Sequence, residues 1–328
     1  MNVSTLLRKA TSRQEFYLIS VIITFSVIMG FINPAFLSFE NFFDVLNNCA
    51  TLGVMAVGVL LVMISGGMDV SFSAIAAVAM YVTVSVLNVH GGTVFYAFAM
   101  AGIIGGLLGL VNATILSYFQ ISALIITLAT SNVFYGLLLQ LVPRAHITSI
   151  PKFLADFGNW IVLPIISFED GKTIGLSAIA FAMILVMLIM SIVLRYTSIG
   201  RNVYALGGSR EAAERAGISI WKTQFFVYCL AGMLAGIASI LNVSMIRYVN
   251  PFNVYNVLMD VIAAVVLGGA KLSGGSGTIF GTFLGVFTLY MIKNSLILMG
   301  IPSTWDSVIV GLIIIVSVAF TASRKKPA

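Results

Sequence analysis

Between Asn48 and Ser65 the chain reads NCATLGVMAVGVLLVMIS, without one charged side chain. A helix crosses the roughly 30 Å of bilayer hydrocarbon with about 20 such residues. Strands of a membrane barrel would need alternating runs of about ten residues, whereas these runs are continuous. The other segments that fit the helical template are 16–32, 70–87, 93–116, 121–142, 173–194, 223–245, 255–269, 277–298 and 305–321. The expected fold is therefore all-α, with about ten transmembrane helices in a compact bundle.

The segment 255–269 is shorter than the others and carries Asp260. We expect it to be tilted, broken or partly re-entrant. Pairs of glycines four residues apart occur in three other segments, at Gly105 and Gly109, at Gly232 and Gly236, and along 277–285. Such glycines let helix backbones approach in lipid, either within one subunit or between two. The spacing predicts close packing and leaves the number of subunits open.

Composition supports the membrane assignment. Of the 328 residues 60% are hydrophobic and only 9% are charged, whereas soluble domains carry about 25% charged residues. Low charge with abundant Phe also excludes a long disordered chain. The net charge of +6 does not point to nucleic acid, because the basic residues are not gathered on one soluble face. Cys49 and Cys229 both lie inside apolar runs, so no disulfide framework is expected.

Loop charge predicts the orientation. Lys and Arg are concentrated near the N-terminus, in the loop 195–222 and at the C-terminus, and such residues favour the cytoplasmic side. Both termini are therefore expected in the cytoplasm. The loop 143–172 then lies outside, where its mixed content predicts a short helix on the membrane surface. We expect one transmembrane domain over residues 1–328, with no soluble catalytic domain.

Motifs for chemistry are incomplete or missing. Gly171-Lys172-Thr173 resembles the end of a phosphate-binding loop, but Ile166 stands where its first glycine is required. No HExxH, GxSxG or CxxC motif occurs, and His90 and His146 are single and distant. We therefore expect no catalytic, cofactor or metal site and no enzyme activity. A channel, a secondary transporter and the membrane half of a larger machine remain.

Polar side chains within the apolar runs are candidates for a solute route. A charge at mid-membrane costs about 2.5–3.5 kcal/mol on insertion scales, so each one needs an explanation. Amides and hydroxyls can bind a neutral polyhydroxylated solute, and they can equally bond neighbouring helices; a charge can also be paired or snorkel. The candidates are Asn48, Asp69, Asn112, Asn132, Asp260, Lys293 and Asn294.

The inner loop 195–222 contains a predicted two-turn helix from Arg210 to Ala216. Ser209 is a good N-cap, Glu211 suits the first turn, and Gly217 is a typical stop after the last residue. Glu211 and Arg215 have the spacing of a helical ion pair. Small side chains at positions 212, 213 and 216 would let the helix seat in a groove on another protein. By itself the stretch could equally be a solvated connector.

The chain resembles the membrane subunits of ribose-type sugar ABC importers over nearly its whole length. The inner loop is similar to the coupling region of that family, Y-A-x-G-G followed by E-A-A-x-x-x-G-I. Further similar motifs are Ile64-Ser65-Gly66-Gly67-Met68-Asp69-Val70-Ser71, Thr127-Leu128-Ala129-Thr130, the run 260–269, Leu272-Ser273-Gly274-Gly275-Ser276-Gly277 and Gly281-Thr282. The chain departs from the family pattern at 72–74, at Ala129 and at 293–295, which leaves the particular solute open.

The resemblance implies an import subunit of the bacterial inner membrane that has no ATPase site of its own. It implies a second permease subunit, identical or similar, two ABC ATPase domains that bind ATP and Mg²⁺, and an extracytoplasmic substrate-binding protein. Glu211 and Arg215 would orient the docking helix, and Gly207 and Gly208 would let the chain turn. The expected coupling residues are Tyr204, Gly207, Gly208, Glu211, Ala212, Arg215 and Gly217.

The expected solute is a sugar, and the alternatives are a furanose-like signal such as autoinducer-2 or a nucleoside. The rival from another class is a proton- or cation-coupled carrier that works alone. An intramembrane enzyme has almost no support among the residues.

Overall fold

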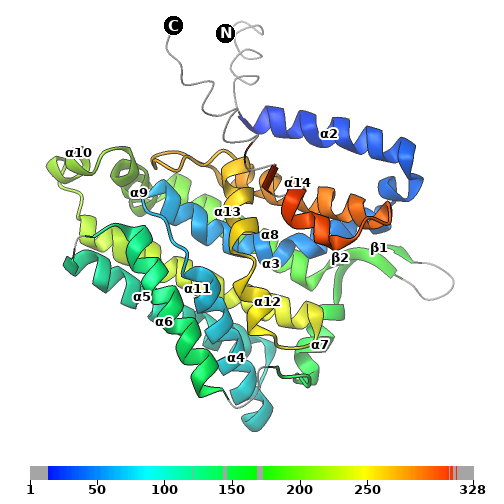
Figure 1. The fold of residues 1–328 in the computed structure, drawn as a ribbon, viewed down its shortest axis with the longest axis horizontal. Helices are drawn as coiled ribbons and strands as arrows, with labels where there is room; N and C mark the ends of the chain where they lie inside the picture. The colour runs from blue at the N-terminus through cyan, green and yellow to red at the C-terminus, as the bar shows by residue number, and fades with distance from the viewer. Residues whose placement is uncertain are drawn as a thin grey trace, which may run out of the picture.

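The computed structural model describes residues 14–119, 121–142, 146–167, 173–309, 311, 312 and 315. Its main elements are helices, as predicted (Figure 1). Within the described residues eight helices are long and apolar enough to cross a membrane. They are α2 (Gln14–Ile32), α3 (Phe39–Ile64), α4 (Phe72–His90), α5 (Val94–Phe119), α6 (Ala123–Leu141), α8 (Ala178–Tyr196), α11 (Ile220–Ile246) and α14 (Ile279–Leu298). The all-α membrane fold is confirmed, whereas the count of ten and the sidedness of the termini stay predictions.

The two remaining expected segments have different outcomes. Segment 255–269 is broken near its start: α12 (Pro251–Tyr255) begins earlier than expected and ends at the segment's first residue, and α13 (Leu258–Leu267) is continuous. Asn250 caps α12 by accepting a hydrogen bond from the backbone N–H of Phe252, and Pro251 occupies its first turn, where a missing N–H is harmless. Segment 305–321 falls largely outside the described residues, after the short η2 (Ser303–Trp305).

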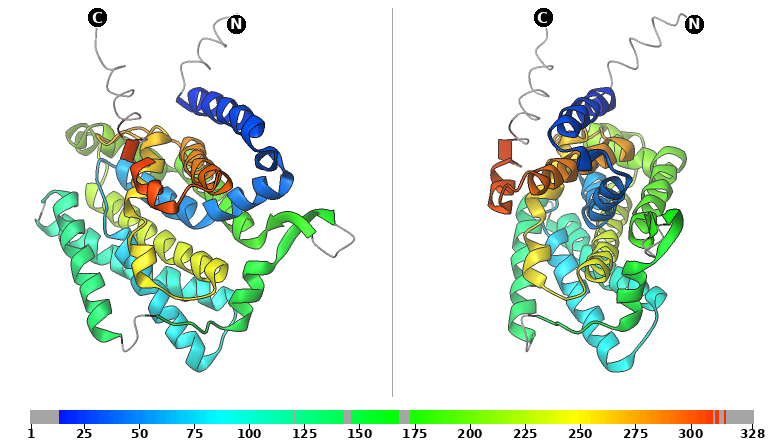
Figure 2. Two further views of the ribbon diagram at one scale, coloured as in Figure 1. Left: turned by 45° about the vertical axis from the view of Figure 1, so that its right-hand side comes forward. Right: turned by 90° about the vertical axis from the view of Figure 1, so that its right-hand side faces the viewer.

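Helix α3 forms the centre of the bundle. Nearly every side chain from Val45 to Ile64 is buried, and α8, α11, α13 and α14 pack around it. A helix that is apolar on all sides is suited to such a position. Helix α2 has the same composition but is mostly exposed and lies along α14, after which η1 (Pro34–Leu37) leads into α3 (Figure 2). Its apolar surface faces away from the protein, as a lipid-facing helix would.

Helices α5 and α11 touch backbone to backbone. A Cβ built on Gly105 would lie 2.1 Å from the carbonyl oxygen of Gly232, and one on Gly236 would lie 2.0 Å from that of Ala101. No side chain fits in these places, so glycine is required at the crossing. The predicted close packing through small residues is confirmed within one chain.

The loop after α6 contains more structure than the sequence indicated. The short helix expected there is present as α7 (Lys152–Asn159). It is followed by an antiparallel pair, β1 (Ile161–Ser167) and β2 (Thr173–Ser177), which projects from the bundle and was not predicted (Figure 2). The helix expected from residue 173 therefore begins only at Ala178, where the Ser177 hydroxyl accepts from the N–H of Ala180.

Candidate functional site

The inner loop folds into two consecutive helices. Helix α9 (Ser198–Gly208), which the sequence did not predict, follows α8, and α10 (Arg210–Arg215) follows α9. The predicted caps of α10 are confirmed. The Ser209 hydroxyl accepts from the N–H of Ala212 at 3.3 Å, and Gly217 has φ +79° while the N–H of Ile218 bonds back to Ala213. These local signals define the helix from both ends.

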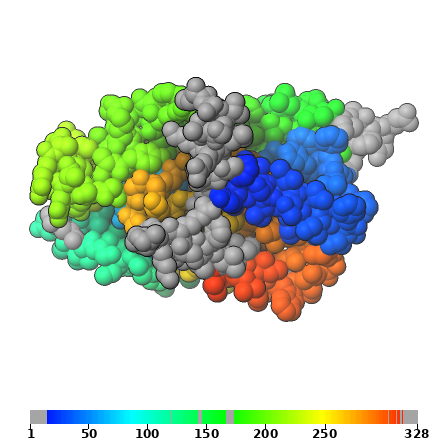
Figure 3. All heavy atoms as spheres, turned by 90° about the horizontal axis from the view of Figure 1, so that it is seen from above, coloured from blue at the N-terminus to red at the C-terminus, as the bar shows by residue number. Residues whose placement is uncertain are grey.

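Helix α10 lies at one end of the molecule, at the left edge of Figure 1 and of Figure 3. Glu211, Ala212 and Arg215 are exposed, but Ala213 is buried on the side of α10 that faces the rest of the protein. Ala213 therefore seats α10 and is not part of its free surface, which corrects one position of the expected docking face. No ion pair joins Glu211 to Arg215, although the structure describes both side chains.

Hollows separate α10 from the membrane bundle on two sides. One, of about 470 Å³, lies between α9, the end of α3 and the start of α6. The other, of about 350 Å³, lies between α10 and the start of α11. Arg210 and Gln224 line both. Helix α10 packs against α9 and α11, whereas all its side chains except that of Ala213 are exposed, which leaves its outer face open to a partner.

A contact between glycines ties α9 to the bundle. A Cβ on Gly207 would lie only 1.7 Å from the carbonyl oxygen of Ile64, and one on Gly274 would lie 2.7 Å from the Cα of Gly66. Gly66 and Gly274 both have φ +85°, which also favours glycine. The N–H of Gly275 donates to the carbonyl of Ile64 at 2.9 Å. We call Gly66, Gly207, Gly274 and Gly275 the glycine joint.

This geometry corrects the turning role expected of Gly207 and Gly208. Both lie within α9, and the chain turns at Ser209, which has an extended backbone. Gly207 is needed for a close approach, whereas a Cβ on Gly208 would meet nothing within 4 Å.

Tyr204 adds a side-chain bond beside the glycine joint. Its hydroxyl donates to the carbonyl oxygen of Gly277 at 2.8 Å. Burial raises the pKa of Tyr204, so the hydroxyl stays protonated and able to donate. Helix α9 is thus attached both to the end of α3 and to the loop between α13 and α14.

A buried polar network continues from the joint into α4, α5 and α6. The Asp69 carboxylate accepts from the N–H and the hydroxyl of Ser71 at 2.7 and 2.6 Å. Asn112 on α5 donates to the same hydroxyl at 2.6 Å, and Thr127 on α6 accepts from the N–H of Val70 at 3.2 Å. Burial raises the pKa of Asp69, while its bonds to Ser71 oppose that rise. In this structure Asp69 and Asn112 hold helices together.

A second polar group lies where α13, α14 and α3 meet, and we call it the polar seam. Lys293 and Asp260 form an ion pair with an Nζ–Oδ2 distance of 2.5 Å and side chains 19% and 24% exposed. Asn294, the next residue along α14, donates to the side-chain oxygen of Asn41 on α3. Two of the three ionisable route candidates, Asp260 and Lys293, are therefore paired with each other.

The last two route candidates lie apart. Asn132 is exposed on α6 and donates to the carbonyl of Leu128, one turn back. Asn48 is half-buried on α3. The seven candidates thus occupy several separate places and share no single face of one helix.

The sequence did not single out Tyr228, which lies beside Gly67 next to the buried polar network. Tyr228 is buried on α11 with its hydroxyl unbonded, and a Cβ on Gly67 would lie 2.7 Å from it. Nothing local marks Tyr228, because it lies inside an apolar run. The glycine joint had a signal in its paired glycines, but which glycines meet depends on the tertiary fold.

Comparison with known proteins places these features in a family. Residues 41–318 match the family described as branched-chain amino acid transport system, permease component. The chain is 33% identical over 302 residues to the ribose import permease protein RbsC of Bacillus subtilis strain 168, covering 92% of this chain and 90% of that protein.

Two further relatives match over similar lengths. The ribose import permease protein RbsC of Escherichia coli strain K12 is 29% identical, with 94% of each chain covered. The autoinducer 2 import system permease protein LsrC of Enterobacter sp. strain 638 is 32% identical, covering 90% of this chain and 83% of that protein. No solved structure gives a significant match.

Proposed function

This chain belongs to the family of permease components of branched-chain amino acid transport systems, and we propose that it is the membrane-spanning subunit of an ATP-binding-cassette importer for a sugar or sugar-like solute. The match covers most of the chain, and the relatives named above are import permeases for ribose or autoinducer 2. Ribose belongs to the class expected from the sequence, and autoinducer 2 is one of the alternatives that the sequence left open. The protein is a multi-pass membrane protein, here assigned to the bacterial inner membrane with both termini inside.

The observation that carries the proposal is the exposed helix α10. It has firm caps, an open outer face and hollows behind it. Such a helix can seat in a groove on a separate ATPase through Ala212 and its exposed neighbours. Glu211 and Arg215 are exposed and do not bond to each other, so both side chains are available for contacts with the ATPase. ATP and Mg²⁺ are bound by two ATPase domains on other chains.

Movement of α10 would reach the spans through α9. The glycine joint and the Tyr204 bond attach α9 to the end of α3 and to the loop before α14. The network around Asp69 then links the α3–α4 loop to α5 and α6. A rigid connection of this kind is what a permease needs in order to convert closure of an ATPase into a change of the bundle. We propose a second permease subunit, with the route between the two.

A cation-coupled carrier is the competing function. Such carriers place ionisable side chains at mid-membrane to bind the coupling ion. Here Asp260 is held by Lys293, and Asp69 is held by Ser71. Both carboxylates are thus engaged with groups of the protein itself, which favours the ATPase-driven alternative.

The test uses the full chain in vesicles with its ATPase and binding protein, identified from the neighbouring genes. We expect uptake of labelled ribose or autoinducer 2 only when ATP and all components are present. Ala212→Trp should abolish uptake and the stimulation of ATP hydrolysis, while the matched change Ser198→Trp, at an exposed site on α9, should leave both intact. Uptake driven by an ion gradient without the ATPase would overturn the proposal, and unchanged uptake by Ala212→Trp would remove the docking role of α10.

A further inference from the structure

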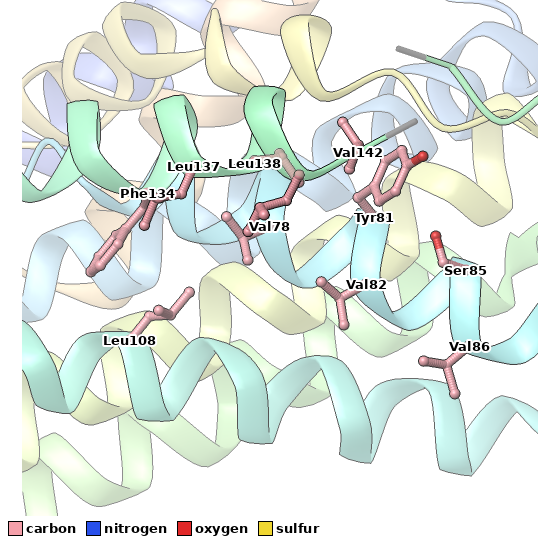
Figure 4. A pocket seen from close by; sticks show the side chains of 11 residues that line it. Val78, Tyr81, Val82, Ser85, Val86, Leu108, Phe134, Leu137, Leu138 and Val142 are labelled. Atoms are coloured by element: carbon pink, nitrogen blue, oxygen red, sulfur yellow. The ribbon is translucent and has the colours of Figure 1, made fainter. Parts of the chain in front are cut away.

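A deep apolar groove lies between α4, α5 and α6. Its volume is about 530 Å³. Val78 and Val82 reach into it from α4, Leu108 from α5, and Phe134 and Leu138 from α6 (Figure 4). Ser85 supplies the one aliphatic hydroxyl of its lining, beside Tyr81. An apolar cavity of this kind is unsuited to a sugar, which needs hydrogen-bond partners on its surface.

A polar pocket adjoins the groove at the end of α4, and we call it the polar mouth. This second pocket, of about 450 Å³, shares Tyr81 and Ser85 with the groove. The rest of its lining is mostly polar and includes Asn88, His146 and Thr148. Asn88 donates to the carbonyl oxygen of Ser149 at 2.9 Å, which holds the segment 146–149 in place as one wall of the pocket. The groove is therefore apolar along its length and has the polar mouth beside one end.

The groove runs along membrane-spanning helices and has its polar mouth at their ends, which is how the acyl chain and headgroup of a lipid are arranged in a bilayer. Helices α4 and α6 are both long and apolar enough to cross the bilayer, and the polar mouth lies where both end, near His90 and Leu141. The rim is open: Val82 is 37% exposed and Leu137 is 53% exposed. The groove is therefore continuous with an outer surface that hydrocarbon must cover.

The exposed amide of Asn132 on α6 does not line the groove. Asn132 precedes Phe134 by two residues, which is roughly 200° around a helix of 3.6 residues per turn. On that other side Tyr135 stacks on Tyr255 of α12, with ring centroids 4.2 Å apart. A solute route or a second subunit that needs polar contacts would use that side, and the groove is left to an apolar occupant.

We propose that the groove holds one acyl chain of a phospholipid, whose headgroup lies against Asn88, His146 and Thr148. Hydrocarbon gains little by moving from a bilayer into an apolar protein surface, because the two are equally apolar. Occupancy over neighbouring lipids therefore depends on the fit of the chain in the groove and on hydrogen bonds from the mouth to the phosphate group. The inference rests on the membrane location alone and does not depend on the solute or on the ATPase.

The test places the full chain in vesicles of phosphatidylethanolamine and phosphatidylglycerol that contain a phospholipid with a photoreactive diazirine near the end of one acyl chain. After illumination, labelled peptides are quantified by mass spectrometry. We expect labelling of residues 78–86 and 134–142 to exceed that of the exposed face of α2 several-fold. Helix α2 serves as the reference because it is the least buried of the eight described spans.

Two variants and one control separate a seated chain from lipid in passing contact. Val82→Trp fills the groove at its rim, and Ser85→Phe adds a ring at the boundary that the groove shares with the polar mouth. Each should reduce groove labelling to the level of α2. Leu139→Trp adds the same bulk at an exposed position of α6 outside the groove and should leave the labelling unchanged. Even labelling of all exposed spans, no response to either filling variant, or a groove protected because a second copy cross-links over it would overturn the proposal.

Discussion

The glycine joint and the polar seam hold helices together in opposite ways. At the joint, Gly207 meets Ile64 backbone to backbone, and there is no room for one carbon atom. At the seam, the long side chain of Lys293 reaches the carboxylate of Asp260, and both side chains are partly exposed. The first contact is fixed by the absence of side chains and the second by their charge.

The difference indicates what each region can do. A contact between backbones has no rotamers to adjust, so the segments on its two sides must move together. An ion pair between flexible side chains can lengthen, separate or change partners at a modest cost. A region built like the joint suits the transmission of movement, and a region built like the seam suits helices that shift during a transport cycle. Four substitutions test this comparison, from the largest expected effect to the smallest.

Gly207→Val should have the largest effect. Its Cβ would overlap the carbonyl oxygen of Ile64, which belongs to the backbone and cannot rotate away. Overpacking usually lowers the free energy of unfolding by about 1–3 kcal/mol, and this overlap should lower it further. Little folded protein should therefore be recovered from membranes. Gly208→Val is the matched control, because a Cβ there meets nothing within 4 Å. Equal recovery of the two variants, measured by size-exclusion chromatography in detergent, would contradict a rigid joint.

Gly274→Ala should be the next most harmful. Its φ of +85° strains any other residue by about 1–2 kcal/mol, and its Cβ would lie 2.7 Å from the Cα of Gly66. Gly300→Ala is the control, because it has φ +73° and open space around it. Both positions share the backbone strain, so the difference between the apparent Tm values of the two variants measures the close contact of residue 274 with Gly66. If Gly300→Ala lowers the Tm as far, backbone strain explains the whole effect.

Lys293→Met should destabilise less than either glycine change. It leaves the Asp260 carboxylate without its cation, at a cost of about 1–3 kcal/mol for a pair that is neither fully buried nor fully exposed. The double change Asp260→Lys with Lys293→Asp should restore most of the Tm, since the pair is reversed and retained. A double variant as unstable as the single one would show that each charge serves some other contact.

Tyr204→Phe should have the smallest effect on stability, about 1 kcal/mol for one hydrogen bond. Its effect on coupling should be larger, because the bond attaches α9 to the loop before α14. We expect more ATP hydrolysed per solute imported in reconstituted vesicles. An unchanged ratio would assign the coupling to the glycine joint alone.

Local signals explain what the sequence predicted correctly. The spans follow from hydropathy, and α10 follows from Ser209 and Gly217, which act within one turn of the chain. The break in segment 255–269 was one of three expected outcomes, because Asp260 shortens the apolar run. These features depend on neighbouring residues only.

The missed features depend on distant residues. Helix α9 contains Gly200, Gly207 and Gly208, which are poor helix formers, and it is stabilised by packing against the end of α3. The strands β1 and β2 pair only with each other among the described residues, and Pro164, which has no backbone N–H, weakens the strand pattern of the first. The partner of Asn112 is Ser71 and the partner of Lys293 is Asp260, far apart in the chain. No spacing rule connects such pairs.

The interruption between α12 and α13 has a consequence for the surrounding bilayer. The ten residues of α13 rise only about 15 Å, roughly half of the hydrocarbon thickness. Since the regular ladder of backbone bonds stops at Asn256, an exposed residue, its peptide groups need water or a thinned lipid layer within reach. Amide protons around Asn256 should therefore exchange with deuterium long before those of the enclosed α3, and such exchange would show that water reaches the bundle beside its polar seam.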